Sequence, residues 1–576
     1  MGLLKEKKRS KRLAARLSGA GGSGSQISPL RPRYLEQPPP CTGGCPSGND
    51  VRGFLTAIGL REKLGAGLDD ACESAWRVCM ETNPFPSVMG RICPHPCEDH
   101  CNRTEKDGAV GISSVERFIG DLALERGLAP APIAGEGPKR ERVAVVGAGP
   151  SGMSCAYQLA RRGYRTTVFE ALPRPGGMLR YGIPSYRLPR EVLDAEIRRI
   201  VGLGVELACG TRIGRDLPFE DLRSGFDAVY VAIGAHQGKS LGIPGEDGPG
   251  VWTGTDFLNH VASGKQVEVG GRLVVVGGGD TAIDAARVSM RVMLDSAAVS
   301  RRLGADVTIL CLETRAEMPA IEREVEEALE EGIRIEHASA AVEILRDERG
   351  VVRAVVVQRI RPGGMDDWLR GRRDSIVGEA YQLPADTVIT AVSQQPRLAE
   401  LAAGGLGDGW LSADAWGRTG VAGVWTGGDS TGLGIATRSI GQARRAAECI
   451  HAALRGGLPA EVDPDKPVLR DRMKLDWYEP RARASRRVMA PEERLARPEQ
   501  EVDAGLTRDD ALAEAARCMS CGKCFGCEAC WMYCQNNCFV KVQQPLHGSF
   551  YTVKLEVCDG CKKCWEECPC GFIVGE

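Results

Sequence analysis

Eight cysteines near the C-terminus repeat a spacing that is typical of iron-sulfur cluster ligands. The segment "CDGCKKCWEECPCG" has the pattern C-x2-C-x2-C-x3-C-P, and the segment that begins at Cys524 repeats its cysteine spacing. In bacterial ferredoxins with two such runs, the fourth cysteine of each run binds the other cluster. We therefore predict one [4Fe-4S] cluster on Cys524, Cys527, Cys530 and Cys568, and another on Cys558, Cys561, Cys564 and Cys534. Zinc, which usually takes two C-x-x-C pairs, is the alternative, and Cys538 and Cys570 have no role in this scheme.

A second set of cysteines lies near the N-terminus. The stretch "PPPCTGGCPSGND" contains Cys41 and Cys45, and "GRICPHPCEDHCNR" adds Cys93, Cys97 and Cys101. Five thiols are too many for one four-iron cluster and too few for two. Either some of them bind no metal, or other ligands come from elsewhere in the chain.

Two glycine motifs follow apolar strands in the middle of the chain. In "VAVVGAGPSG", Gly147, Gly149 and Gly152 have the G-x-G-x-x-G spacing that lets a pyrophosphate approach the backbone at a helix N-terminus. Glu170 ends the next predicted strand and is placed to bind an adenosine ribose. The second motif, "VVVGGGDTAID", carries Gly277, Gly279 and Ala282 about 130 residues later. The two motifs predict two dinucleotide-binding domains.

Length and composition agree with a multidomain chain. The 576 residues are too many for one core, and a net charge of -2 gives no global field that favours nucleic acid. No apolar run of 18 residues predicts a membrane span, and the basic N-terminus lacks the apolar region of a secretory signal. The 23 cysteines therefore favour metal binding in a cytoplasmic protein over disulfides. Four scattered ones, Cys155, Cys209, Cys311 and Cys449, are interpreted as small core residues.

These patterns predict a multidomain α/β protein with seven parts. They are a basic flexible tail (1–30), a helical iron-sulfur domain (31–135) with no strand pattern in residues 31–118, a first FAD-binding part (136–270), an NAD-binding domain (271–395), a second FAD-binding part (396–456), a linker that ends in the helix "TRDDALAEAARC" (457–517), and a ferredoxin-like domain (518–576). Both dinucleotide-binding domains are expected to be Rossmann-like.

The stretches "GGMLRYGIPSYRLP", "VWTGGDSTG" and "AVSQQP" resemble the small subunit of glutamate synthase and its relatives. The resemblance implies that the first glycine motif holds FAD and the second holds the nicotinamide. It also implies that Asp429 bonds to the ribityl chain and that a helix from near Thr437 points its positive end at the flavin ring. The implied FAD residues are Gly147, Gly149, Pro150, Ser151, Gly152, Glu170, Gly177, Met178, Tyr181, Gly182, Gly428, Asp429 and Thr437. No catalytic acid or base is assigned.

One departure from this family bears on the nicotinamide. Relatives that use NADPH have an Arg-Arg pair where this chain has Leu312 and Glu313, in "ILCLETRAEMPA". Because a carboxylate bonds to free ribose hydroxyls and repels a phosphate, NADH is expected in preference to NADPH. Arg315, which lies nearby, weighs against this expectation. The implied nicotinamide residues are Gly277, Gly278, Gly279, Asp280, Thr281, Ala282, Glu313 and Arg315.

The same family offers ligands for the N-terminal cysteines. Its members carry "EA-x-R-C-x-x-C" at the N-terminus, whereas this chain has that pattern in "LAEAARCMSCG", before the ferredoxin-like run. The resemblance implies that Cys518 and Cys521, from the same chain or from a dimer mate, join Cys41 and Cys101. Cys45, Cys93 and Cys97 would then bind a fourth cluster with Glu116. The alternative is a single N-terminal cluster with spare thiols, which gives three clusters in all.

With its C-terminal module, the chain resembles the DsrL-type iron-sulfur flavoproteins associated with dissimilatory sulfite reductase. The resemblance implies electron transfer between NAD(H) and the sulfite reductase, or another redox protein, through FAD and [4Fe-4S] clusters, in a cytoplasmic homodimer. Two alternatives remain: a subunit like the glutamate synthase small chain or another NAD(P)H:ferredoxin oxidoreductase, and a non-catalytic electron-carrying subunit. Bleaching of the flavin by NADH would separate the enzymes from the last.

Overall fold

The computed structural model describes residues 28–295, 306–401, 405–407, 409–459 and 466–576. The expected basic tail lies almost wholly outside these residues. The chain forms two compact units, which are described separately: a cysteine-rich unit (Met1–Leu128, Ala460–Arg486 and Gly505–Glu576) and a two-sheet unit (Ala129–Pro459 and Arg487–Ala504).

Helices make up the N-terminal part of the cysteine-rich unit, as predicted. The longer helices are α3 (Val51–Gly59), α5 (Leu68–Met80), α6 (Pro86–Ile92) and α9 (Ile112–Glu125), and the shorter ones are α2 (Pro40–Gly44), α4 (Arg61–Leu64), α7 (Pro96–Asp99) and α8 (Thr104–Asp107). Helices α6 and α9 cross at two glycines. A Cβ atom at Gly120 would lie 2.3 Å from the Ser87 nitrogen, and one at Gly90 would lie 2.4 Å from the Arg117 nitrogen. This close packing fixes the segment that precedes Cys93.

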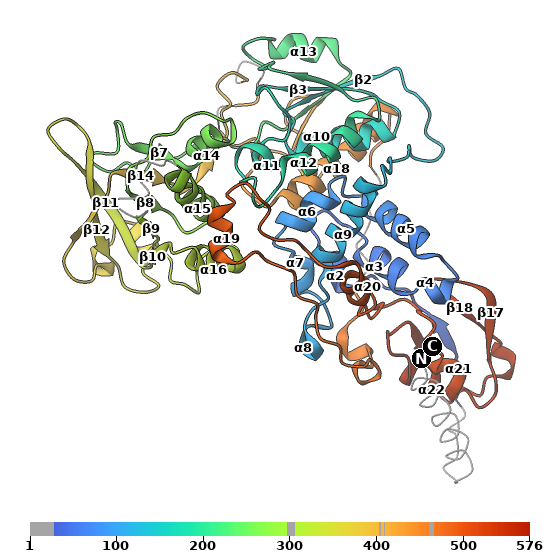
Figure 1. The fold of residues 1–576 in the computed structure, drawn as a ribbon. Coiled ribbons are helices and arrows are strands. Elements are labelled where there is room, and N and C mark those ends of the chain that lie inside the picture. The colour runs from blue at the N-terminus through green and yellow to red at the C-terminus, as the bar shows by residue number, and fades with distance from the viewer. Residues whose placement is uncertain (1–27, 296–305, 402–404, 408, 460–465) are drawn as a thin grey trace. The chain divides into compact units, whose positions relative to one another are not determined.

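The C-terminal part of this unit has a small ferredoxin-like core. Its elements are α20 (Arg508–Ala515), α21 (Ala529–Tyr533), β17 (Phe539–Leu546), β18 (Ser549–Val553), α22 (Lys563–Glu566) and β19 (Ile573–Gly575). Strand β19 pairs antiparallel with β1 (Pro32–Tyr34), so the two ends of the described chain lie side by side (Figure 1). The expectation of no strand in residues 31–118 was therefore wrong for β1, which gains backbone partners only through the C-terminus.

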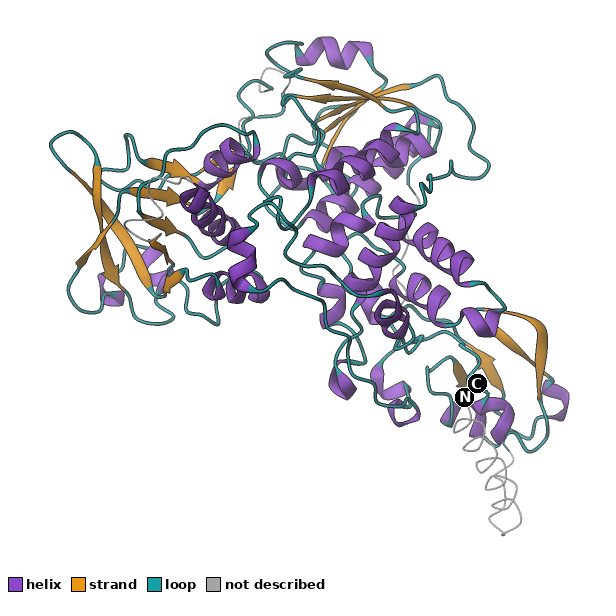
Figure 2. Cartoon of the chain, viewed as in Figure 1, coloured by secondary structure: helices purple, strands orange, loops and turns teal. Residues whose placement is uncertain are grey.

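The two-sheet unit contains two parallel five-stranded sheets (Figure 2). The first has the order β16 (Val424–Thr426), β5 (Ala228–Val231), β2 (Arg142–Val146), β3 (Arg165–Glu170) and β4 (Glu206–Cys209). The second has the order β10 (Arg334–Glu336), β9 (Asp306–Leu310), β8 (Arg272–Val276), β14 (Thr387–Thr390) and β7 (Val251–Thr253). Each glycine motif follows the central strand of its sheet, β2 or β8, which confirms two Rossmann-like domains. Strand β7 precedes residue 271 but belongs to the second sheet.

Helices and smaller strands complete this unit. The helices are α10 (Pro150–Arg161), α11 (Met178–Tyr181), α12 (Arg190–Val201), α13 (Phe219–Gly225), α14 (Gly254–Ala262), α15 (Asp280–Asp295), α16 (Glu322–Glu330), α17 (Met365–Leu369), α18 (Ala436–Leu454) and α19 (Pro491–Ala496). The further strands are the pair β6 (Gln237–Gly238) and β15 (Gln394–Gln395), and the antiparallel sheet of β11 (Ser339–Arg346), β12 (Val352–Arg359) and β13 (Tyr381–Pro384). Helices α10 and α18 pack together, which places the start of α18 near the first glycine motif.

The segment expected as a linker is divided between the two units. Residues 466–486 belong to the cysteine-rich unit, whereas 487–504 pack with the two-sheet unit, where the Val502 nitrogen donates to the Tyr186 carbonyl at 2.9 Å. Its final helix is α20, as predicted.

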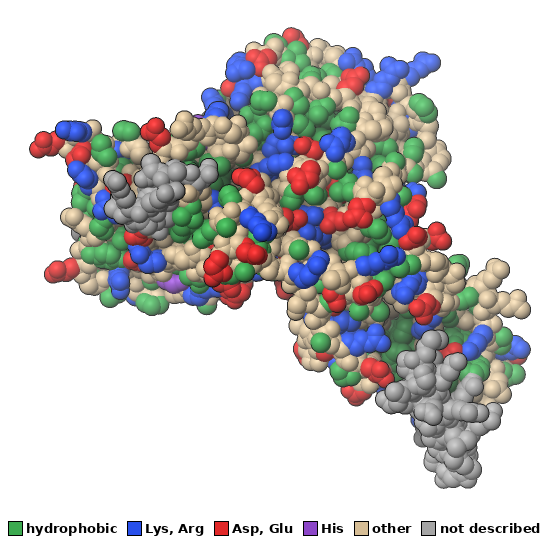
Figure 3. Space-filling model, in the orientation of Figure 1, with side chains coloured by type: hydrophobic (Ala, Val, Ile, Leu, Met, Phe, Trp, Pro, Cys, Tyr) green, Lys and Arg blue, Asp and Glu red, His purple; other side chains and the backbone are tan. Residues whose placement is uncertain are grey.

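The described surface agrees with the low net charge. On the face drawn in Figure 3, basic and acidic side chains alternate rather than separate into fields of one sign. Among the described helices, none combines the length and apolar character that crossing a membrane requires.

Candidate active site and cysteine clusters

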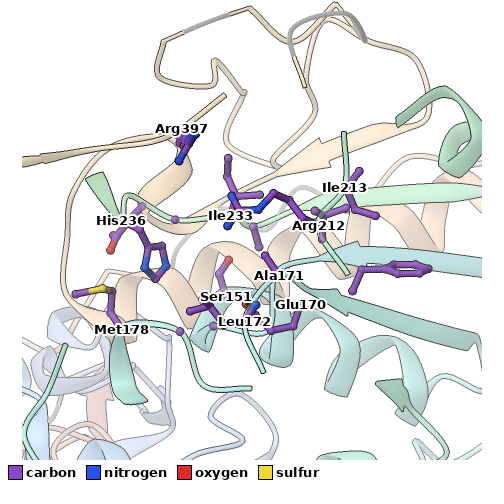
Figure 4. A pocket seen from close by; sticks show the side chains of 18 of the residues that line it. Ser151, Glu170, Ala171, Leu172, Met178, Arg212, Ile213, Ile233, His236 and Arg397 are labelled. Atoms are coloured by element: carbon purple, nitrogen blue, oxygen red, sulfur yellow. Dashed lines mark hydrogen bonds between the residues drawn. The ribbon is translucent and has the colours of Figure 1, made fainter. Parts of the chain in front are cut away.

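A cavity of about 510 Å³ lies at the carboxyl end of the first parallel sheet. Its wall includes the first glycine motif, and the side chains of Ser151, Glu170, Arg212 and His236 surround it (Figure 4). This is the position at which parallel α/β sheets bind nucleotides. Other predicted residues that line it are Gly147, Gly149, Pro150, Gly177, Met178 and Asp429.

The glycines of this cavity are required by close backbone contacts. Gly147 has φ +105°, and a Cβ atom there would lie 2.3 Å from the Ala232 carbonyl oxygen. A Cβ at Gly152 would lie 1.9 Å from the Gly147 oxygen. A Cβ at Gly177 would lie 2.8 Å from the Gly149 Cα, so two loops meet at the cavity through glycine alone. Only glycine gives this close approach, and the wall so formed fits the dinucleotide FAD.

Glu170 is fixed within the wall by backbone amides. Its two carboxylate oxygens accept hydrogen bonds from the Ala148 nitrogen at 2.8 Å and the Leu172 nitrogen at 2.9 Å. Burial raises its pKa, and these two amides oppose that shift. Each carboxylate oxygen keeps a second lone pair, so Glu170 can still accept a bond from a ribose hydroxyl.

Asp429 lies where the second FAD-binding part returns to the cavity. Its carboxylate accepts a hydrogen bond from the Gly434 nitrogen at 3.2 Å, and burial raises its pKa to about 6. Helix α18 begins at Ala436, so Thr437 is in its first turn, and the predicted helix near Thr437 is present. Gly152, Tyr181, Gly182, Gly428 and Thr437 are not among the residues that line the cavity.

In the cysteine-rich unit, four cysteines from distant parts of the chain line one small cavity, here called the shared cavity. They are Cys41, Cys101, Cys518 and Cys521. All four belong to one chain, so no dimer mate is needed to bring them together. These are the four residues that the family resemblance grouped.

The docking of α20 explains this arrangement. The buried Arg517 side chain donates to the Ala109 and Gly108 carbonyls at 2.9 and 2.8 Å, and it pairs with Glu514. Glu514 in turn accepts from the Gly111 nitrogen at 2.7 Å. The Glu and Arg of the "EAARC" segment thus fasten Cys518 to the loop that follows Cys101. Arg52 adds a bond of 2.8 Å to the Cys521 carbonyl.

Two further cavities lie within the ferredoxin-like core. The first, here called the 524 cavity, is lined by Cys524, Cys527, Cys530 and Cys568, and by Cys570. The second, the 558 cavity, is lined by Cys558, Cys561, Cys564 and Cys534, and by Cys538. The fourth cysteine of each run therefore lies in the cavity of the other run, which is the exchange that the spacing predicts. The four-thiol donor sets fit [4Fe-4S] clusters.

A fourth group of thiols surrounds Glu116 on α9. Burial raises the pKa of the Cys97 thiol, and the nearby charges of Cys45, Glu116 and Cys93 raise it further. The Glu116 carboxylate is buried and accepts hydrogen bonds from Asn83 at 2.8 Å and Asn49 at 3.1 Å. Burial raises its pKa to about 7, against the effect of these bonds. No group of three His, Cys, Asp or Glu side chains within the described residues suits a single metal ion. Cluster ligands need not converge in that way, because each binds a different iron.

Two family comparisons agree with these sites. Residues 141–455 match pyridine nucleotide-disulphide oxidoreductase, and residues 35–128 match the 4Fe-4S domain II of dihydropyrimidine dehydrogenase. The chain belongs to the pyridine nucleotide-disulphide oxidoreductase family. Together with the iron-sulfur domain, this makes it an NAD(P)H-dependent iron-sulfur flavoprotein oxidoreductase related to the glutamate synthase small chain.

Three curated relatives match long stretches of this oxidoreductase. The beta subunit of the NADPH-Fe(3+) oxidoreductase of Geobacter sulfurreducens (strain DL-1 / KN400) is 35% identical, covering 84% of this chain and 75% of that protein. The beta subunit of the NADP(+)-dependent formate dehydrogenase of Moorella thermoacetica is 33% identical, covering 84% of this chain and 70% of that protein. The small chain of the NADPH glutamate synthase of Escherichia coli (strain K12) is 35% identical, covering 55% of this chain and 67% of that protein.

The second glycine motif of the oxidoreductase has an acid at its turn. A Cβ atom at Gly278 would lie 2.6 Å from a carboxylate oxygen of Glu313, so this acid sits directly against the motif. Arg315 is turned to Glu322, with which it forms two bonds of 2.6 and 2.9 Å. Asp280 accepts from the Ile321 nitrogen and Thr281 from the Gln394 amide, so both lie within the local hydrogen-bond network, and Ala282 is fully buried.

The sequence interpretation missed two cysteines of the iron-sulfur region. Cys72 and Cys79 lie on α5, so the N-terminal region holds seven cysteines rather than the five of its two motifs. The Cys79 sulfur is 3.3 Å from Glu116 Oε1 and 3.0 Å from Asn49 Nδ2. A full cysteine count would have found Cys79, but its spacing matches no ligand pattern. Of the four cysteines expected in the core, Cys155, Cys311 and Cys449 are buried, whereas Cys209 is only partly buried.

Proposed function

We propose that this oxidoreductase moves electrons between NADH and a protein partner through FAD and four [4Fe-4S] clusters. The observation that carries the proposal is the shared cavity, where two cysteines adjoining the ferredoxin-like core meet two of the N-terminal domain. This arrangement links the N-terminal iron-sulfur domain to the C-terminal module within one chain. When bound, FAD accepts a hydride from a reduced nicotinamide and releases electrons one at a time.

The choice of NADH rests on Glu313. Its carboxylate lies against Gly278, where the adenosine ribose of a dinucleotide is expected to bind. A carboxylate there accepts bonds from both ribose hydroxyls and repels a 2'-phosphate. Arg315, the nearby cation that could oppose this effect, is paired with Glu322. The relatives described above are named for NADPH or NADP(+), so this preference would set the chain apart from them.

The proposed partner is dissimilatory sulfite reductase, as in DsrL-type proteins. Support comes from the resemblance of the two C-terminal cysteine segments to those proteins, and from relatives that are themselves named as subunits of larger oxidoreductases. The ferredoxin-like core would contact the sulfite reductase, because its cluster ligands are the ones farthest in sequence from the glycine motifs.

Two measurements under anaerobic conditions test the function. NADH should bleach the flavin absorbance of the purified holoprotein, and adding dissimilatory sulfite reductase with sulfite should then give steady NADH oxidation. Failure of NADH and NADPH alike to bleach the flavin would favour a non-catalytic electron-carrying subunit. Bleaching without any sulfite-dependent turnover would reject this partner but keep the oxidoreductase.

A further inference from the structure

Each cavity of the ferredoxin-like core holds one cysteine more than a four-iron cluster needs. In the 524 cavity the additional residue is Cys570, and in the 558 cavity it is Cys538. Both side chains are 2% exposed, so neither faces solvent. A sequence-based ligand scheme leaves both without a role, yet the fold brings each of them to a cluster cavity.

The two additional cysteines occupy equivalent places. Cys570 follows Cys568 by two residues, and Cys538 follows Cys534 by four. Cys568 and Cys534 are the residues that cross from one run to the cavity of the other. In each cavity, therefore, the fifth thiol accompanies the ligand that comes from the more distant segment of the chain.

Contacts hold each additional cysteine beside its neighbour. The sulfur atoms of Cys568 and Cys570 are 3.9 Å apart. The Cys538 nitrogen donates to the Cys534 sulfur at 3.3 Å. The backbone carbonyls of the two additional residues are also bonded, that of Cys570 to the Gly522 nitrogen at 2.7 Å and that of Cys538 to the Lys554 nitrogen at 2.8 Å. Small side-chain rotations would therefore exchange one sulfur for the other.

We propose that Cys570 and Cys538 are reserve ligands, each able to bind the cluster iron that its neighbour, Cys568 or Cys534, otherwise holds. This inference rests on the proposed [4Fe-4S] clusters of the ferredoxin-like core. In the exchange, the bond between iron and the first sulfur breaks and a bond to the second sulfur forms. The proton lost by the incoming thiol passes to the departing thiolate, so charge balances and no electron is transferred.

Such reserve ligands would protect each cluster against iron loss at the position where a ligand is most easily displaced. A cluster that loses one thiolate ligand releases iron readily, and a buried thiol a few ångströms away would replace that ligand before the iron leaves. The crossing cysteines depend on the packing of two separate segments, so they are the ligands most affected when the core loosens.

The test compares iron content in four variants purified as the full holoprotein under anaerobic conditions. Cys568→Ala should keep the iron content of the wild type, with an altered electron paramagnetic resonance spectrum of the reduced 524-cavity cluster. Cys570→Ala should keep both the iron and the wild-type spectrum. The double variant Cys568→Ala/Cys570→Ala should lose about four iron atoms. Cys530→Ala, which removes a ligand that lacks such a neighbour in the chain, is the matched control and should lose iron as the double variant does.

A three-iron signal, or full loss of the cluster, in Cys568→Ala alone would overturn the proposal for this cavity. The pair Cys534→Ala and Cys534→Ala/Cys538→Ala repeats the test in the 558 cavity, so a double variant that fails to fold in one cavity leaves the other to decide. Iron retained in the unaltered cavity reports whether the cysteine-rich unit of each variant is folded, and FAD content reports on the two-sheet unit. A wild type without iron in the ferredoxin-like core would reject the proposed function and the reserve ligands together. A wild type with full iron whose Cys568→Ala variant loses the cluster would reject only the reserve ligands.

Discussion

At the residue scale, we expect the cofactor specificity of the oxidoreductase to depend on single acidic side chains beside glycine. Glu313 is held against Gly278, and Glu170 is bonded to the Ala148 amide of the first motif. Each of the two glycine turns therefore has a glutamate side chain beside it. In the proposed assignment, the glycines admit a dinucleotide and the acids determine which ribose substituents are tolerated.

Glu313→Arg should narrow or invert the preference for NADH. The wild type is expected to show a kcat/KM for NADH at least tenfold above that for NADPH, or roughly 1.4 kcal/mol of discrimination. An arginine at position 313 would replace the carboxylate with a cation that binds the 2'-phosphate. Steady-state kinetics with both nucleotides measures the ratio, and Glu322→Gln, which releases Arg315 but keeps Glu313, is the control. Equal or better use of NADPH by the wild type would contradict the assignment.

Gly149→Val should abolish FAD binding without unfolding the protein. Gly149 has φ -76°, which any residue adopts, and a Cβ atom there makes only an ordinary contact of 3.8 Å with Gly177. The larger side chain would occupy the cavity wall where a pyrophosphate must approach. The purified variant should lack flavin absorbance but keep its C-terminal clusters. Gly147→Val should instead fail to fold, because a Cβ atom at position 147 would lie 2.3 Å from the Ala232 carbonyl oxygen. Full FAD content in a folded Gly149→Val protein would refute the assignment of this turn.

At the element scale, a buried ionic network fastens α15 to α16 in the second domain. Arg287 is fully buried and binds Glu324 at 2.6 Å and Glu331 at 2.7 Å, and its guanidinium lies 4.9 Å from the Tyr186 ring. Burial raises the pKa of Glu331, but Arg291 and Arg287 lower it more, so this carboxylate stays ionised in the fold. Helix α15 begins at Asp280, directly after the second glycine motif, so the network sets the position of the nucleotide turn.

Arg287→Met should destabilise this domain by about 3–5 kcal/mol, because the buried carboxylates of Glu324 and Glu331 lose one of their cationic partners. Scanning calorimetry should show a lower transition temperature for the two-sheet unit. Arg323→Met is the matched control. Arg323 binds Glu324 and Glu327 but is 34% exposed, so its loss should cost at most about 1 kcal/mol.

The effect should also depend on pH. Because the pKa of Glu331 in the fold lies below its usual value, the stabilisation is present above that usual value and is lost as the pH falls through the folded pKa. The difference between wild type and Arg287→Met should therefore shrink in acid. Equal destabilisation by both arginine variants would show that the network does not carry the stability of the domain.

At the scale of the whole molecule, the shared cavity ties the two ends of the cysteine-rich unit together. Cys518→Ser with Cys521→Ser should remove about four of roughly 16 iron atoms per chain, while the clusters of the ferredoxin-like core stay intact. The contacts of Arg517 and Glu514 do not involve the substituted thiols, so α20 should stay docked. NADH should still reduce the flavin, but electron transfer to the partner should slow sharply.

Iron analysis and electron paramagnetic resonance measure this loss. Cys72→Ser is the control, because Cys72 is a buried N-terminal cysteine that lines none of the three cysteine cavities. Its iron content should equal that of the wild type. A wild-type content near 12 iron atoms, unchanged in the double variant, would indicate three clusters and a single one in the N-terminal domain.

Local spacing was sufficient to predict much of this protein. The glycine motifs follow central strands as expected, because a strand, a tight turn and a helix N-terminus are formed by consecutive residues. The exchange of Cys534 and Cys568 could also be predicted, since the ferredoxin pattern itself encodes it. The N-terminal domain is helical as expected, and only β1 differed, because its partner strand lies at the other end of the chain.

The tertiary structure alone decided that the shared cavity forms within one chain and that further thiols lie beside the predicted ligands. Cys41 and Cys518 are 477 residues apart in sequence, and only the docking of α20 through Glu514 and Arg517 brings their segments together within one chain. Likewise, no spacing rule places Cys79 beside Glu116 or Cys570 beside Cys568. The physical reason is that a motif specifies ligands through short-range backbone geometry. Contacts between distant segments depend instead on buried hydrogen bonds and packing that only the complete fold assembles.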